Sequence, residues 1–485
     1  MRSPFRLNLF AAALRLVLAT ALAAQAPVAN PANNDPNRSL REPHVGGTSN
    51  LTVLSHVPLG GWSQVIGVEV EQELSRPYAY VSRDDWAGDV SRTSKGIDII
   101  DIKEPTKARV IYSWRIPNGE IHQGTGGQDS KYFKLKGRYY AVQSMQFGNG
   151  PDGDVGAVVF DVTALPDSSR VQEIGFIRTP DTRGGFHNVF TYKHSDGRVL
   201  LFATGGDPGG RIYDMERFLV HDPNYGMIRK MPIPEASSTG GGGGEGGGGG
   251  GGRGPRLAGY HDYYVGYDAA TKRDLFYGAG TGGYYVYDVT KPEEPKLLVA
   301  LTGISGVTYG HTFTPTPDGR YAVTETEYQY TPLRIFDLKP GVDGTVKTIS
   351  RPVGAWIGTW DGNPHNHQVR WPYVFVAGYM DGIQVFNIMD PANPYTVAYH
   401  YTCQCILPGG KEGAGQNGGM EGASHIEIRN ADGLIVMTDR RSGFWLFHMN
   451  GFDGWNGHQW GMPNVSSAQD WDRGPEGTPK PSKTS

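Results

Sequence analysis

A short apolar strand recurs along the chain, and this repeat constrains the fold more than any other feature. Each copy is usually entered by glycine and closed by one polar residue, as in "GIDIIDI", "GYYVYDV" and "GIQVFNI". Successive copies lie about 50 to 74 residues apart. A period of this length indicates that each repeat is one supersecondary unit. The seven closing residues are Asp101, Asp161, Asp214, Asp288, Asp337, Asn387 and His448.

Further strands flank most copies of the repeat. Upstream, "TPTPDGRYAVTETE" and "RNADGLIVMTD" place Asp-Gly between apolar runs, which is a signal for a β-hairpin. Downstream, segments such as "DVTKPEEPKLLVAL" pass through a proline-containing turn into another apolar strand. Each unit therefore has four short strands. Seven such units predict an all-β fold, a seven-bladed β-propeller with four-stranded antiparallel blades.

The boundaries of the propeller follow from one spare strand. The segment "NLTVLSHVPL", residues 50–59, precedes the first unit, whereas the seventh unit lacks a fourth strand. We expect the N-terminal strand to complete the last blade and close the ring, because closure removes two exposed strand edges. The propeller then spans residues 50–471. Residues 238–256, with their polyglycine run, are expected to be a flexible insertion within it, and residues 472–485 a flexible tail.

Three of the units, "GIDIIDIKEPTKARVI", "GYYVYDVTKPEEPKLL" and "GIQVFNIMDPANPYTV", resemble the LVIVD-repeat family of exported bacterial β-propellers. The resemblance covers about residues 60–450. It implies the propeller fold but no activity, because few members of that family have an assigned one and a fold does not carry a function by itself. The chain is also distantly similar to the selenium-binding-protein-like propellers.

The N-terminal segment has the layout of a secretory signal peptide. Arg2 and Arg6 precede an apolar run that ends near the small-residue sequence "ALA". We expect a signal peptide over residues 1–26, a disordered linker over residues 27–49, and an exported protein that is periplasmic or extracellular. No later run has the roughly 18 apolar residues of a membrane span. With a formal net charge of −4 and no basic cluster, nucleic acid is not an expected partner.

Histidine stands just before the expected innermost strand of five blades. Because innermost strands surround the central channel of a propeller, a shared position at their entrance becomes a ring on one face. The sequence therefore predicts that five imidazoles converge at the channel mouth. They are His187, His261, His311, His367 and His425.

Other polar side chains are expected near this face. The second strand of a blade returns antiparallel to the first, so it brings Glu325, Glu327 and Asp439 toward the histidines. His365 forms a His-x-His pair with His367, and His122 precedes the second blade with a longer lead into its strand.

The residues leave three interpretations of the histidines open. Neutral imidazoles with nearby carboxylates could bind a transition metal such as Cu, Zn or Fe. The similarity to selenium-binding-protein-like propellers, which also carry histidines at blade entries, supports this interpretation. Alternatively, each histidine could hydrogen-bond within its own blade, as the Gly-His of WD-type propellers does. The third interpretation is an anionic or sugar ligand held by several histidines and Arg440.

The sequence does not decide between two classes of function. One is a metal-binding or ligand-binding propeller with oxidoreductase-type activity on a small molecule. The other is a non-catalytic scaffold on the cell surface or in the periplasm, which binds a protein partner on the propeller face. Cys403 and Cys405 could bind copper, form a disulfide or simply be buried.

Overall fold

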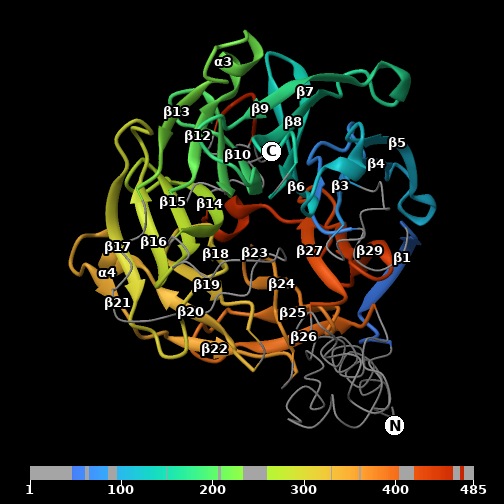
Figure 1. The fold of residues 1–485 in the computed structure, drawn as a ribbon. Coiled ribbons are helices and arrows are strands. Elements are labelled where there is room, and N and C mark those ends of the chain that lie inside the picture. Colours follow the sequence, from blue (N-terminus) through green and yellow to red (C-terminus); the bar gives the residue numbers. More distant parts are fainter. Residues whose placement is uncertain are drawn as a thin grey trace, which may run out of the picture.

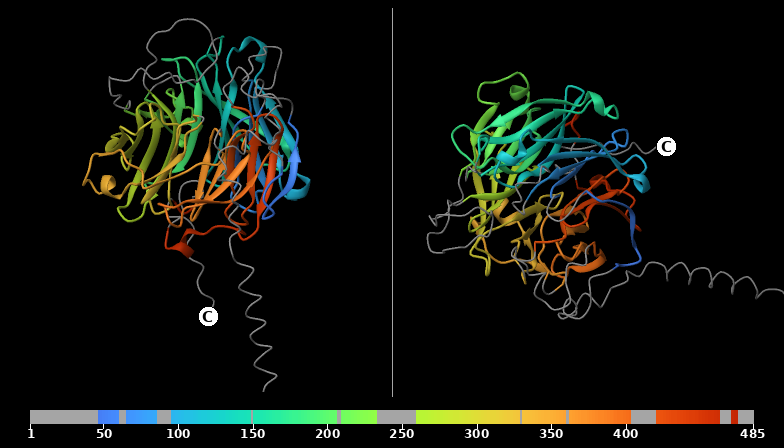
Figure 2. Two further views of the ribbon diagram at one scale, coloured as in Figure 1. Left: turned by 90° about the horizontal axis from the view of Figure 1, so that it is seen from below. Right: turned by 45° about the vertical axis from the view of Figure 1, so that its right-hand side comes forward.

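Seven antiparallel β-sheets are arranged around a common centre in the computed structural model (Figure 1). The structure describes residues 46–59, 65–85, 95–148, 150–205, 209–232, 259–328, 330–359, 362–402, 420–462 and 470–474. The fold is the predicted seven-bladed β-propeller. Figure 2 shows the blades from the side.

Each blade places its first strand innermost. The first four blades are β2 (Val68–Val70), β3 (Tyr78–Arg83), β4 (Gly96–Asp101), β5 (Arg109–Arg115); β6 (Gly126–Leu135), β7 (Arg138–Gln146), β8 (Val155–Asp161), β9 (Gln172–Arg178); β10 (Phe186–Lys193), β11 (Val199–Gly205), β12 (Arg211–Asp214), β13 (Met227–Lys230); and β14 (Tyr260–Asp268), β15 (Arg273–Gly280), β16 (Gly283–Asp288), β17 (Lys296–Thr302), with β21 (Thr348–Ile349) added parallel to β17.

The remaining three blades follow the same order. They are β18 (Thr312–Pro315), β19 (Tyr321–Glu325), β20 (Leu333–Asp337), β22 (Gly354–Trp356); β23 (His367–Arg370), β24 (Tyr373–Ala377), β25 (Ile383–Asn387), β26 (Tyr395–His400); and β27 (Ala423–Ile428), β28 (Ile435–Asp439), β29 (Gly443–Met449), β1 (Leu51–Val57). The described helices are short: α3 (Met215–Leu219), α4 (Lys339–Val342), η2 (Pro105–Lys107), η3 (Gly119–Ile121), η4 (Ser168–Arg170) and η5 (Gly457–Trp460).

The N-terminal strand closes the ring, as predicted. β1 pairs antiparallel with β29, with Leu51 opposite Met449 and Val57 opposite Phe444. In Figure 1 the blue β1 lies beside the orange-red β29, so the two ends of the propeller meet in one blade. The pairing covers the outer edge of β29, which would otherwise expose unpaired backbone groups.

The polar residue that closes each repeat has a local structural role. In several blades its side chain accepts a hydrogen bond from the backbone N–H two residues later, which is an Asx-turn at the end of the third strand. The donors are the N–H groups of Lys103, Thr163, Thr290, Lys339 and Met389. Asp214 in the third blade instead caps helix α3, accepting from Glu216 and Arg217, which is why this blade lacks the proline turn.

The hydrophobic core lies between neighbouring blades. Side chains of one sheet pack on the face of the next: Phe186 of the third blade belongs to the same cluster as Val155 of the second. Such packing fixes the blades relative to one another and holds the innermost strands around the centre.

Two tryptophans that follow the last blade, Trp455 and Trp471, contact other blades. The indole N–H of Trp455 donates to the carbonyl oxygen of Trp371 at the first hairpin of the sixth blade, 2.9 Å away. Trp471 packs edge-on against Tyr132 of the second blade, with ring centroids 5.9 Å apart. The two tryptophans are thus anchored on blades that lie on different sides of the channel.

Several expectations fall on residues outside the described ranges. They concern the signal peptide and most of the linker, the glycine-rich insertion, Cys403 and Cys405, and the tail beyond residue 474. Within the described ranges, no helix is both long and apolar enough to cross a membrane.

Candidate functional site

Irregular backbone at the start of the innermost strands sets the positions of two histidines. The register between β10 and β11 shifts between Phe186 and Val189, and the register between β14 and β15 shifts between Tyr260 and Asp262. A bulge of this kind re-aims a side chain that a regular strand would send to the other face. Because of the bulges, the side chains of His187 and His261 need not follow the strict alternation of a regular strand between its two faces. Their ring centroids lie 4.6 Å apart.

Four imidazoles form a continuous row across neighbouring blades. Beyond His187 and His261, the centroids of His261 and His311 are 3.9 Å apart. The centroids of His311 and His365 are 4.6 Å apart. The row therefore runs from the third blade to the sixth; His311 and His365 are buried, whereas His187 and His261 are half-buried.

Two glutamates at the end of β19 face this row. A carboxylate oxygen of Glu325 binds Nδ1 of His311, and the other accepts the backbone N–H of Glu327 at 2.5 Å. Oε2 of Glu327 lies 3.4 Å from Nε2 of His311, and Oε1 lies 3.7 Å from Nε2 of His365. The antiparallel return of the second strand places both carboxylates at the histidine end, as expected.

Three residues offer ligand atoms around one common space. One such atom from each of His261, His311 and Glu327 lies within 4.8 Å of the other two. Ligand nitrogens of a zinc ion are about 2.0–2.1 Å from it, so an ion would draw the most distant of these atoms together by roughly 1 Å. Nδ1 of His261 and Nε2 of His311 are buried and make no hydrogen bond with any described residue.

The outer nitrogens of three histidines are held by acceptors. Nδ1 of His311 binds Glu325, Nδ1 of His365 binds the carbonyl oxygen of Ser424, and Nδ1 of His187 lies 2.8 Å from Oε1 of Gln146. A hydrogen bond to one ring nitrogen fixes the ring orientation and leaves the other nitrogen as the ligand atom, which is the usual arrangement around metal-binding histidines.

The electrostatics separate His311 from its neighbours. Burial lowers the pKa of His187 to about 4, and burial together with the positive charge on His311 holds the pKa values of His261 and His365 well below the ordinary value. Burial would also lower the pKa of His311, but Glu325 and Glu327 outweigh it and raise this pKa to about 9. Three imidazoles are thus neutral at neutral pH, and neutral imidazole is the form that binds metals. His311 would release its proton on binding an ion.

The structure does not bring His367 and His425 into the row. Nε2 of His367 lies 3.2 Å from the carbonyl oxygen of Val323, so this ring contacts the neighbouring blade instead. His365 takes the expected place. The N–H of Ala377 donates to Asn366, whereas the carbonyl oxygen of Ala377 accepts from His365, so the ladder is irregular just ahead of β23. His425 is buried in β27 and, among the described residues, forms no ring contact with the four histidines.

Two further candidates have other partners. His122 stacks on Phe147 with centroids 4.9 Å apart, and its Nε2 lies 3.2 Å from the carbonyl oxygen of Pro117. Asp439 accepts the hydroxyl of Thr402 at 2.6 Å and the backbone N–H groups of the next turn. Both side chains therefore bind nearby loop residues.

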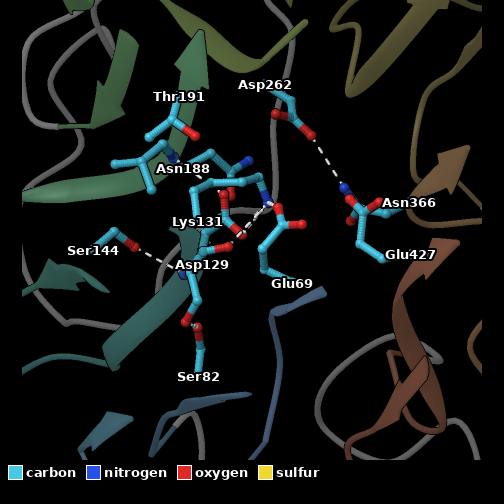
Figure 3. Close-up of polar contacts among 12 residues, drawn as sticks. Glu69, Ser82, Asp129, Lys131, Ser144, Asn188, Thr191, Asp262, Asn366 and Glu427 are labelled. Atoms are coloured by element: carbon cyan, nitrogen blue, oxygen red, sulfur yellow. Dashed lines mark hydrogen bonds and ion pairs between the residues drawn. The ribbon is translucent and has the colours of Figure 1, made fainter. Parts of the chain in front are cut away.

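Sequence reasoning missed the polar lining of the channel beneath the row (Figure 3). Three of the histidines are followed by a polar residue that enters this lining: Asn188, Asp262 and Asn366. The amide of Asn366 donates to Asp262 at 3.1 Å, across the channel between the sixth and fourth blades. The recurring dipeptides "HN", "HD" and "HN" were the available signal.

Charged residues lie deeper in the same channel. Nζ of Lys131 is 2.9 Å from Asp129 and 3.7 Å from Glu69. Figure 3 shows these residues around the channel together with Glu427, which accepts the amide of Gln368 at 2.7 Å. Burial, the dominant cause, raises the pKa values of Glu69 and Glu427; the charge of Glu427 raises that of Glu69 further, and the charge of Asp129 raises that of Glu427.

Comparison with known proteins supports the fold alone. No family model and no curated protein matches the sequence. Among solved structures, the chain is similar to Raptor from Chaetomium thermophilum, with a TM-score of 0.52 and 13% sequence identity. The match covers 87% of this chain but only 31% of the Raptor chain. At this identity the likeness says nothing about substrate or partner.

Proposed function

We propose that this protein is an exported propeller that binds a transition metal at the channel mouth through His261, His311 and Glu327, and that it acts there on a small molecule. The observation that carries the proposal is the orientation of His311. Its Nδ1 is held by Glu325, whereas its buried Nε2 faces Glu327 without a hydrogen bond. A histidine that served only to staple its blade would not need a second carboxylate beside its other nitrogen.

The ligand types suit the expected metals. Imidazole nitrogens with one carboxylate bind Zn, Cu and Fe. Three protein ligands leave a coordination position for water or substrate, as catalytic sites do. Zinc would supply Lewis acidity, and copper or iron one-electron chemistry of the oxidoreductase type. His365 and His187 extend the donor set on either side of the three ligands.

Burial of His311 and its partner Glu325 separates this proposal from the scaffold alternative. His311 is 2% exposed, and Glu325 is fully buried. A protein partner that docks on the propeller face could not reach these side chains. Burial of an ionised Glu325–His311 pair is costly, and such pairs are retained where they serve a role other than stability.

The proposal is tested by metal titration of the full-length exported protein after treatment with a chelator. Zn²⁺ and Cu²⁺ should bind the wild-type protein with one site per chain. His261→Ala and His311→Ala should each weaken binding by more than the roughly 10–100-fold cost of outer-shell changes.

His367→Ala is the matched control, because His367 is a buried histidine of the same face that binds a neighbouring carbonyl group. It should keep the affinity of the wild type. Equal metal content in all four proteins, or none in the wild type, would leave the histidines with a structural role.

A further inference from the structure

Tyr379 is a buried phenol at the edge of the histidine row. It follows β24, and its ring is 4.7 Å from that of His365. Its side chain is 1% exposed. The phenol hydroxyl donates a hydrogen bond to Oε1 of Glu327 at 2.7 Å. No motif in the sequence pointed to this residue.

The backbone of Tyr379 is in a conformation that rarely suits a tyrosine. Its φ angle is 41°, in the left-handed region where glycine is the low-energy choice. A non-glycine residue there is strained and persists when its surroundings impose the conformation. Such strain concentrates at functional sites.

Hydrogen bonds from two directions hold this backbone in place. The N–H of Tyr379 donates to the carbonyl oxygen of Ala423 at 2.7 Å, and the N–H of Ala423 donates back at 2.9 Å. Within its own turn, the carbonyl of Tyr379 also accepts the N–H of Gly382 at 2.9 Å. The inner strand of the seventh blade therefore fixes the point from which the phenol reaches Glu327.

Glu327 is also held in a left-handed conformation, with a φ angle of 49°. Its backbone N–H is bound by Glu325, and its Oε1 by Tyr379. Only Oε2 then remains on the side of His311 Nε2, at 3.4 Å. The hydrogen bond from Tyr379 thus selects which carboxylate oxygen faces Nε2 of His311, while Oε1 stays between the phenol and His365.

We infer that Tyr379 is a positioning residue for the proposed metal site. Its hydroxyl donates a hydrogen bond to Oε1 of Glu327, so that the carboxylate binds an ion through Oε2 alone. This inference rests on the proposed metal-binding function. It concerns coordination geometry, because a carboxylate with one oxygen engaged contributes one ligand atom and keeps the coordination number low. Freed from Tyr379, Glu327 can offer both oxygens.

The test is Tyr379→Phe in the full-length protein, compared with the wild type by Zn²⁺ competition titration and by the visible spectrum of the Co²⁺-substituted protein. The affinity should fall about 10–100-fold, the range for outer-shell partners of metal ligands. The Co²⁺ absorption bands should weaken, because their intensity falls as the coordination number rises. A purely structural tyrosine would leave the Co²⁺ spectrum unchanged.

A double-mutant cycle with Glu327→Ala identifies the path of the effect. If Tyr379 acts through Glu327, adding Tyr379→Phe to Glu327→Ala should change the affinity by less than about 2-fold, since the acceptor of the tyrosine hydroxyl is already lost. Additive losses would mean that the tyrosine acts elsewhere and would overturn the inference.

Tyr192→Phe is the matched control. Tyr192 is fully buried in the third blade, and its hydroxyl donates to Asp274 at 2.7 Å, within a network distinct from the row. It should lose a similar hydrogen bond without changing metal affinity. Should Tyr379→Phe fail to fold, p-aminophenylalanine at position 379 keeps an N–H donor on the same ring and should preserve the spectrum.

The outcomes separate the inference from the proposed function. A wild-type protein that binds no metal contradicts the proposed function and, with it, the role of Tyr379. A wild-type protein that binds metal, with a Tyr379→Phe variant of equal affinity and equal spectrum, leaves the proposed function intact and overturns the inference.

Discussion

At the scale of residues, the histidine row shows what a repeat register can and cannot predict. Alignment of the repeats found His187, His261 and His311, because all three stand directly at the entrance of an inner strand. It chose His367 over His365, because the strand pattern begins at His367 and gives no sign of the irregular step before it. Polar residues follow His187, His261 and His365 into the channel lining, but Gln368 follows His367 in the same way, so this position does not separate the two histidines.

The pKa of His311 leads to a prediction about Glu325. Because this pKa is raised from 6.5 to about 9, the protonated histidine contributes stability that is complete below pH 6.5 and is lost as pH rises through 9. In Glu325→Gln the partner charge is absent. We expect the metal-free wild type to lose on the order of 3 kcal/mol of unfolding free energy between pH 6 and pH 10, and the variant distinctly less.

Chemical denaturation at a series of pH values measures this difference. The same variant should bind Zn²⁺ about 10–100-fold more weakly, because Glu325 orients His311. Parallel stability curves for the two proteins would show that the ion pair does not determine the protonation of His311. Glu173→Gln is a suitable control, since Glu173 is a carboxylate bound to the Trp114 indole on the outside of the propeller.

At the scale of elements, the four strands per blade were predictable because each one carries its own signal. The closing aspartate makes an Asx-turn, and Asp-Gly marks the hairpins. The bulges in β10 and β14 were not predictable, because a bulge adds one residue without changing the apolar pattern of the strand that follows. The position of the histidine side chains depends on those bulges.

The closing strand leads to a prediction at this scale. Leu51 of β1 and Leu59 just after it are 5% and 6% exposed and belong to the core. Burial of a leucine stabilises a fold by about 1.5–3 kcal/mol. A chain that starts at residue 60 should therefore lose at least roughly 3–6 kcal/mol of unfolding free energy relative to one that starts at residue 46.

Urea denaturation of the two chains, followed by tryptophan fluorescence, measures this loss. Thr52→Ala serves as the control within β1, because Thr52 lies on the exposed side of the strand. If the two chains unfold at the same urea concentration, the pairing of β1 with β29 does not close the ring in solution.

At the scale of the whole molecule, the sequence predicted the architecture more fully than the site. Seven repeats determine a ring, and a ring determines a channel with a mouth where inner strands begin. Which side chains meet there depends on where one blade packs against the next, and no pattern within a single repeat reports this. The ion pair of Lys131 with Glu69, the bond between Asn366 and Asp262, and the contact of Tyr379 with Glu327 each join residues of two different blades.

The most direct test of the proposed metal site is an anomalous diffraction measurement at the zinc edge on crystals of the zinc-loaded protein. We predict one strong anomalous peak at the channel mouth, about 2.0–2.2 Å from a nitrogen of His261, a nitrogen of His311 and an oxygen of Glu327. A zinc-loaded crystal with no peak among these three residues, or with its only peak beside His367 or His425, would contradict it.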